Sequence, residues 1–173
     1  MRVYVPATTT SLRSGLARGD FGRDVTAFGV TAGIREWYVD DDIEELEYAA
    51  SGQAVRASLR MVDADPSALR RRVVLSFDVA ESAVELRDDL DRGAVRVADG
   101  LTVPALAAVH IDDDDAEPTI ARAAAVVLEA DLGSLGAQDV VDDAEGFELS
   151  WYAPEEVSAL VATLDALHPT TDD

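Results

Sequence analysis

DDDIEELEYAASGQAVRASLRMV, residues 40–62, decides the fold class because it predicts one long amphipathic helix. Its apolar residues recur at steps of three and four, which places them on one face of a helix. They are Ile43, Leu46, Ala50, Ala54, Ala57 and Met61. A helix with a single apolar stripe must cover another layer, and the segments around it are typical of strands.

The acids at the start of this helix have a structural explanation. Asp42 lies three residues before Glu45, the spacing of a capping box with Asp in place of Ser or Thr. Asp41 and Glu44 have the same spacing. Acids in the first turn also interact favourably with the helix dipole. Capping and solvation therefore account for most of this acid run.

Apolar segments on both sides of the helix predict one β-sheet. The main strands are expected at 2–6, 25–31, 72–79, 94–98 and 103–111, with shorter ones at 83–87 and 147–152. Further helices are expected at 8–18, 118–132, 137–144 and 154–167. Alternation in FELSWY (147–152) predicts that Trp151 points inward and Tyr152 lies near the surface.

The predicted fold class is α+β. We expect a single globular domain over 1–168, in a two-layer arrangement with a mixed β-sheet covered by amphipathic helices. A frayed acidic tail is expected over 169–173.

The composition excludes several kinds of chemistry. The chain has no cysteine, so disulfides, thiolate metal ligands and thiol catalysis are absent. It has no apolar leader and no apolar stretch of roughly 18–20 residues, which predicts a soluble cytoplasmic protein without a membrane partner.

The charge is strongly negative, with 35 acidic and 14 basic residues and a net charge of −21. All the basic residues are arginine, which a GC-rich genome explains, while a salty cytoplasm is a second explanation for the dense carboxylates. Such a surface repels polyanions, so we expect no nucleic-acid partner. Mimicry of nucleic acid by the carboxylates stays a minor alternative.

Aromatic residues beside acids indicate a partner surface. Each of the two tryptophans is followed by a tyrosine, in Trp37-Tyr38 and Trp151-Tyr152. Aromatic side chains ringed by charge are favoured at protein interfaces. The candidate partner-binding residues are Trp37, Tyr38, Glu44, Glu47, Tyr48 and Tyr152. The first hypothesis is therefore a non-enzymatic protein-binding or regulatory domain, without a cofactor, whose partner has a basic or mixed-charge surface.

AVHIDDDD (108–115) carries the alternative hypothesis. Period-2 alternation would deliver His110, Asp112 and Asp114 to one side of a strand end, as one nitrogen and two oxygen ligands. That set suits Mn²⁺, Fe²⁺ or Zn²⁺ and predicts a divalent-metal-dependent hydrolase with Asp78 as a base. The competing interpretation is a solvated acidic loop that caps the next helix. The chain has no nucleophile elbow and no Walker loop.

Four segments resemble a known family. MRVYVPAT, REWYVDDDIEELEYAA, RGAVRVA and ELSWYA are similar to segments of a domain-of-unknown-function family of small uncharacterised proteins from high-GC actinobacteria. The resemblance extends from Met1 to about Ala153. It implies a bacterial cytoplasmic protein and assigns no catalytic residue.

Overall fold

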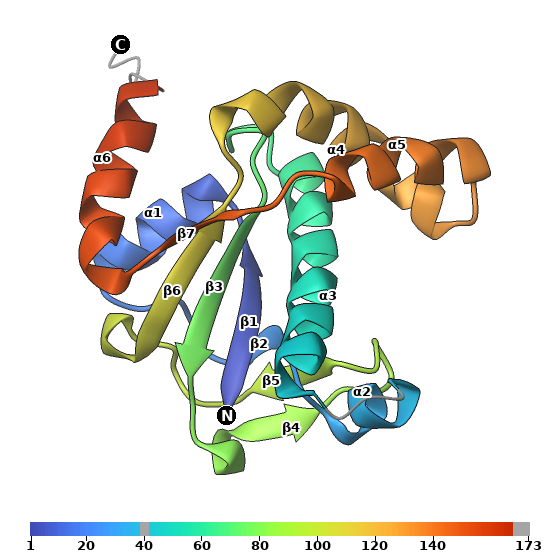
Figure 1. The fold of residues 1–173 in the computed structure, drawn as a ribbon. Coiled ribbons are helices and arrows are strands. Elements are labelled where there is room, and N and C mark those ends of the chain that lie inside the picture. Colours follow the sequence, from blue (N-terminus) through green and yellow to red (C-terminus); the bar gives the residue numbers. More distant parts are fainter. Residues whose placement is uncertain (39–41, 168–173) are drawn as a thin grey trace.

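The computed structural model describes residues 1–38 and 42–167, and its centre is one open sheet of seven strands. The strand order is β4-β5-β2-β1-β3-β6-β7 (Figure 1). The strands are β1 Arg2–Ala7, β2 Val25–Gly29, β3 Val73–Asp78, β4 Val84–Leu86, β5 Ala94–Val97, β6 Leu106–Ile111 and β7 Ser150–Tyr152. The helices are α1 Thr9–Arg18, α2 Ala32–Trp37, α3 Ile43–Ala64, α4 Glu117–Asp131, α5 Leu135–Glu145 and α6 Val157–Leu167.

The predicted α+β class with one sheet is confirmed, and two details differ. Every pairing between these strands is antiparallel, where a mixed sheet was expected. Helices also lie on both faces of the sheet, where two layers were expected. Helices cover both faces because the central strands carry apolar residues on both, such as Val73 and Val74 at successive positions of β3, and both faces must then be buried.

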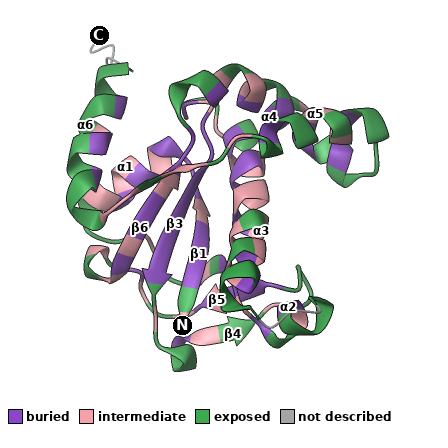
Figure 2. Cartoon of the chain, viewed as in Figure 1, coloured by how far each residue is buried: buried purple, intermediate pink, exposed green. Residues whose placement is uncertain are grey.

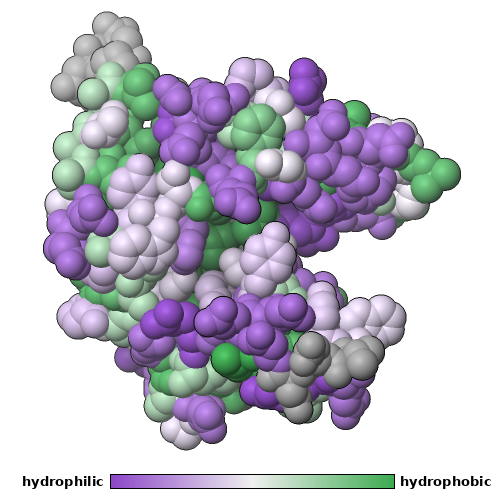
Figure 3. Space-filling view, viewed as in Figure 1, coloured by the Kyte–Doolittle hydropathy of each residue, from purple (hydrophilic) through white to green (hydrophobic). Residues whose placement is uncertain are grey.

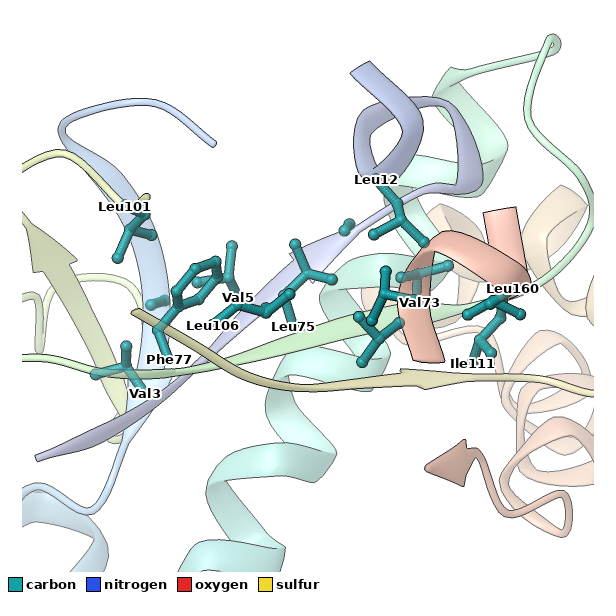
Figure 4. Close-up of a cluster of buried hydrophobic side chains, with 14 of the residues drawn as sticks. Val3, Val5, Leu12, Val73, Leu75, Phe77, Leu101, Leu106, Ile111 and Leu160 are labelled. Atoms are coloured by element: carbon teal, nitrogen blue, oxygen red, sulfur yellow. The ribbon is translucent and has the colours of Figure 1, made fainter. Parts of the chain in front are cut away.

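One face of the sheet packs against α1 and α6. Figure 4 shows Val5, Leu75 and Phe77 of the sheet in this cluster, with Leu12 of α1 and Leu160 of α6. The central strands β1, β3 and β6 are buried along most of their length (Figure 2). Burying them supplies the main favourable term for folding.

The other face packs against α3, the long helix that the sequence predicts. The carboxylate of Asp42 caps this helix by accepting a hydrogen bond from the backbone N–H of Glu44 at 3.0 Å. Asp41, the other predicted cap, lies outside the described residues. Ser58 fixes the helix to the sheet, because its hydroxyl donates to the Ala7 carbonyl at 2.8 Å and accepts from the Val73 N–H at 2.8 Å.

The predicted apolar stripe of α3 is confirmed for Leu46, Ala50 and Ala54, which are fully buried. Ala57 and Met61 are only partly buried. Ile43 is an exception and is exposed at the first helical residue.

α4 and α5 form an antiparallel pair that projects from the body as an arm (Figure 1). Small residues, among them Ala123, Ala130 and Ala144, pack between these helices and the C-terminal part of α3. No helix among the described residues is long and apolar enough to cross a membrane. The predicted tail over 169–173 is outside the described part of the chain.

Candidate functional site

Polar side chains lie on the face of the sheet that α3 only partly covers. Strand alternation places Tyr4 and Ser76, which are register partners, on the same face as the apolar residues under α3. His110 and Trp151, paired across β6 and β7, lie on the same face beyond the helix, in the row of Val74. α3 packs over β1, β2 and β3, so β6 and β7 lie beside it. Polar side chains therefore lie on this face of the sheet at the edge of the area that α3 covers.

A groove of about 830 Å³ runs along α3 at this place. Most of its lining comes from α3, from the sheet face with Tyr4 and His110, and from the end of α5 with the strip that follows it; Tyr38 after α2 and Asp91 before β5 also contribute. Figure 3 shows the molecule hollowed between the α4–α5 arm and the lower body. The lining includes Tyr38, Glu44, Glu47, Tyr48, Asp91, Glu145, Phe147, Glu148 and Leu149.

His110 is a neutral group in this groove. Its Nε2 atom lies 2.9 Å from the hydroxyl of Ser76, and Ser76 is itself 1% exposed. Burial, together with the positive charge of Arg2, lowers the pKa of His110 below its ordinary value. The imidazole is therefore uncharged at neutral pH, and Ser76 fixes its orientation.

Tyr4 reports a negative electrostatic environment at the floor of the groove. Burial, and then the nearby carboxylate of Glu47, raise the pKa of Tyr4 to about 12. A phenolate beside Glu47 would be a second negative charge in a poorly solvated place. Burial disfavours a charge of either sign, whereas the Glu47 carboxylate favours a positive one.

The arginines of the lining are engaged with acids. Arg56 and Arg60 both bond the carboxylate of Asp131, at 2.9 and 2.6 Å. Arg72 bonds both carboxylate oxygens of Asp112, at 2.8 and 2.7 Å. Arg56 also lies 4.0 Å from the Glu145 carboxylate. The lining contains more acidic than basic residues, so the groove is negatively charged.

The structure does not bring the candidate metal ligands together. The carboxylate of Asp112 is fully buried and taken up by Arg72, whereas His110 bonds Ser76. Asp114 is exposed in the turn that leads into α4. Asp78 lies at the end of β3, where Arg2 bonds both of its oxygens at 3.1 and 2.9 Å and lowers its pKa. Among the described residues, no three histidine or acidic side chains form a group that could hold a metal ion.

Four of the six candidate partner residues line the groove: Tyr38, Glu44, Glu47 and Tyr48. Trp37 lies elsewhere, at the end of α2, where the guanidinium of Arg92 stacks 3.6 Å from its ring centre.

The predicted orientation of the second Trp-Tyr pair is wrong. Trp151 is 59% exposed, whereas Tyr152 packs against the hydrophobic core on the other face of the sheet, which α1 and α6 cover. FELSWY enters the sheet only over its last three residues, and it pairs with β6 in the register that turns Tyr152 inward.

Sequence reasoning missed Tyr4, Ser76 and the Arg72–Asp112 ion pair. A weak signal existed for the pair, since Arg72 directly precedes one apolar strand and Asp112 directly follows another. Their contact depends on β3 and β6 being antiparallel neighbours, which spacing along the chain does not reveal.

A family model described as a family of unknown function, DUF6912, matches residues 1–161. The chain belongs to this family. The match confirms the resemblance to a family of unknown function, without showing its actinobacterial origin, and extends it beyond Ala153 into α6. No curated protein and no solved structure matches the chain. In this DUF6912 protein the groove along α3 is the candidate functional site.

Proposed function

We propose that this DUF6912 protein is a non-enzymatic protein-binding or regulatory domain, and that its groove along α3 receives a basic segment of a protein partner. The observation that carries the proposal is that exposed tyrosines line the same groove as carboxylates, and that these carboxylates lie on both of its walls. Tyr48, on α3, is 80% exposed and lies beside Glu47. Glu145 and Glu148 stand on the other wall.

The shape of the groove supports this proposal. Its volume of about 830 Å³ lies within the range of roughly 300–1,000 Å³ that is usual for binding pockets. Leu149 and Phe147 provide apolar surface in the lining. Tyrosine provides a large contact area at a small cost in side-chain entropy, which makes it a frequent anchor in interfaces.

Charge selects the kind of partner. The carboxylates of the groove, in a chain with a net charge of −21, repel acidic segments and attract basic ones. The proposal predicts that the partner associates more slowly and binds more weakly as the salt concentration rises. Salt screens the charges at the rim of an interface, and these charges mainly increase the association rate.

Peptide display tests the proposal. A library of random peptides is selected on the immobilised protein, and binding of the enriched peptides is then measured by fluorescence polarisation. We expect sequences with arginine or lysine next to an apolar residue, and a loss of binding of about tenfold or more in the Tyr48→Ala/Glu148→Gln variant. The matched control, Leu132→Ala/Glu155→Gln, changes an exposed leucine and an exposed glutamate outside the groove and should bind normally.

Two outcomes would overturn the proposal. One is a selection that yields no binders or only acidic and neutral peptides. The other is equal loss of binding in the groove variant and in the control.

A further inference from the structure

We infer that the floor of the groove beside Tyr4 binds one organic cation, the guanidinium or ammonium group of an arginine or lysine side chain. The inference rests on the proposed function, since this side chain would belong to the basic partner segment. It adds a defined subsite to the groove, with Glu47 as the anion, Tyr4 as the aromatic surface and His110 as an uncharged neighbour.

The first argument is the placement of Tyr4. It is 7% exposed, and what remains accessible lies in the groove lining. A buried phenol beside a carboxylate is unusual on a sheet face that is otherwise apolar under α3. A cation above the ring would interact with the π-system and with Glu47 at the same time.

The second argument concerns the positive groups nearby. Arg2 is close enough to influence both Tyr4 and His110, but its guanidinium bonds both oxygens of Asp78. Arg72 likewise bonds both oxygens of Asp112, and Arg56 bonds one oxygen of Asp131 through two nitrogens. These three arginines therefore complete other ion pairs. The Glu47 carboxylate interacts with the Tyr4 hydroxyl, and because a carboxylate can accept several hydrogen bonds it can accept one from a cationic ligand as well.

The third argument is the state of His110. An imidazolium at this position would repel a cation, whereas burial keeps the ring neutral. One ring nitrogen is taken by Ser76, which leaves the other for a ligand. If that nitrogen accepts a hydrogen bond, the donor is a group such as the N–H of a guanidinium or ammonium ion.

Titration with small amides, followed by ¹H–¹⁵N NMR, tests the inference. The probes are N-acetyl-arginine methylamide and N-acetyl-lysine methylamide, with N-acetyl-citrulline methylamide as the neutral match of the arginine probe. We expect saturable shifts at Tyr4, Glu47 and His110 with at least one cationic probe and none with citrulline. Glu47→Gln, which keeps the shape and removes the charge, should weaken binding about tenfold or more.

Two controls make the result specific. Glu155→Gln removes a carboxylate outside the groove and should leave binding unchanged. Tyr4→Phe keeps the ring, so it should retain most of the binding if the aromatic surface is what the cation contacts. Shifts that do not saturate, equal binding of citrulline, or no effect of Glu47→Gln would overturn the inference.

The same titration separates this inference from the proposed function. If selected peptides need the groove but the amides do not bind near Tyr4, the protein-binding function stands and the cation subsite is wrong. If the amides bind there but no peptide depends on the groove, the cation subsite stands and the protein-binding function is wrong.

Discussion

Replacing Asp112 by alanine should destabilise the protein by about 3–5 kcal/mol. The side chains of Arg72 and Asp112 are 2% and 0% exposed, and three bonds of 2.7–2.8 Å join the Asp112 carboxylate to the Arg72 guanidinium and backbone N–H. The substitution leaves a buried guanidinium without its counter-ion. It also weakens the hold of Arg72 on the Phe147 carbonyl, at 2.9 Å, where the groove-lining strip begins.

Urea unfolding followed by tryptophan fluorescence measures this loss. With an m value of about 2 kcal/mol/M, the midpoint should fall by about 1.5–2.5 M. The thermal midpoint should fall by about 6–20 °C for a chain of this size.

The matched control is Asp89→Ala. Arg87 bonds Asp89 through the same two nitrogens at 2.7 and 2.8 Å, but this pair is on the surface. Surface ion pairs contribute about 0–1 kcal/mol, so the control should lose little. Equal losses in Asp112→Ala and Asp89→Ala would refute the argument that burial makes the Arg72–Asp112 pair costly to break. The double variant Arg72→Met/Asp112→Leu should recover much of the loss, because no buried charge is left alone.

Three further predictions concern single residues. Burial lowers the pKa of His110 in the folded state below its unfolded value of about 6.5. The stability that neutral His110 contributes above about pH 6.5 is therefore lost as the pH falls through the folded-state pKa. In the His110→Gln variant, the free energy of unfolding measured from pH 7 to 5 should decline less. The phenol of Tyr4 should titrate near pH 12, and the Glu47→Gln substitution should lower this pKa. The titration of Tyr4 is measured as the difference in phenolate absorbance between a protein that has Tyr4 and the same protein with Tyr4→Phe. Gly15→Ala should cost about 1–3 kcal/mol in urea unfolding, because the added methyl group would overlap the ring of Phe21; an unchanged midpoint would contradict this packing.

Local patterns along the chain were sufficient to predict most of the elements, although α2 (Ala32–Trp37) was missed. The 3.6-residue period of α3 and the apolar runs of β1 and β3 are properties of contiguous residues, and both are present where expected. Strand direction depends on which strands become neighbours, and for this reason the expected mixed sheet was wrong. β1 lies between β2 and β3, with β3 joining it only after the long α3 crossover, and local pattern does not encode that order.

The site was predictable only where its residues are contiguous. Glu44, Glu47 and Tyr48 share one helix, so their common surface could be expected from helical spacing. Tyr4 and His110 come from strands about a hundred residues apart, and only the sheet order brings them to one groove. The same strand order places Asp112 beside Arg72, and the two form an ion pair. Asp112 is therefore not grouped with His110 and Asp114, as their spacing along the chain suggested.

Hydrogen–deuterium exchange of the protein with and without a selected basic peptide tests the central claim most directly. The account predicts slower exchange along α3 and over residues 147–152, with α1 and α6 unchanged. Slower exchange confined to α1 and α6, or none with a peptide that binds, would contradict the claim that the groove along α3 is the binding surface.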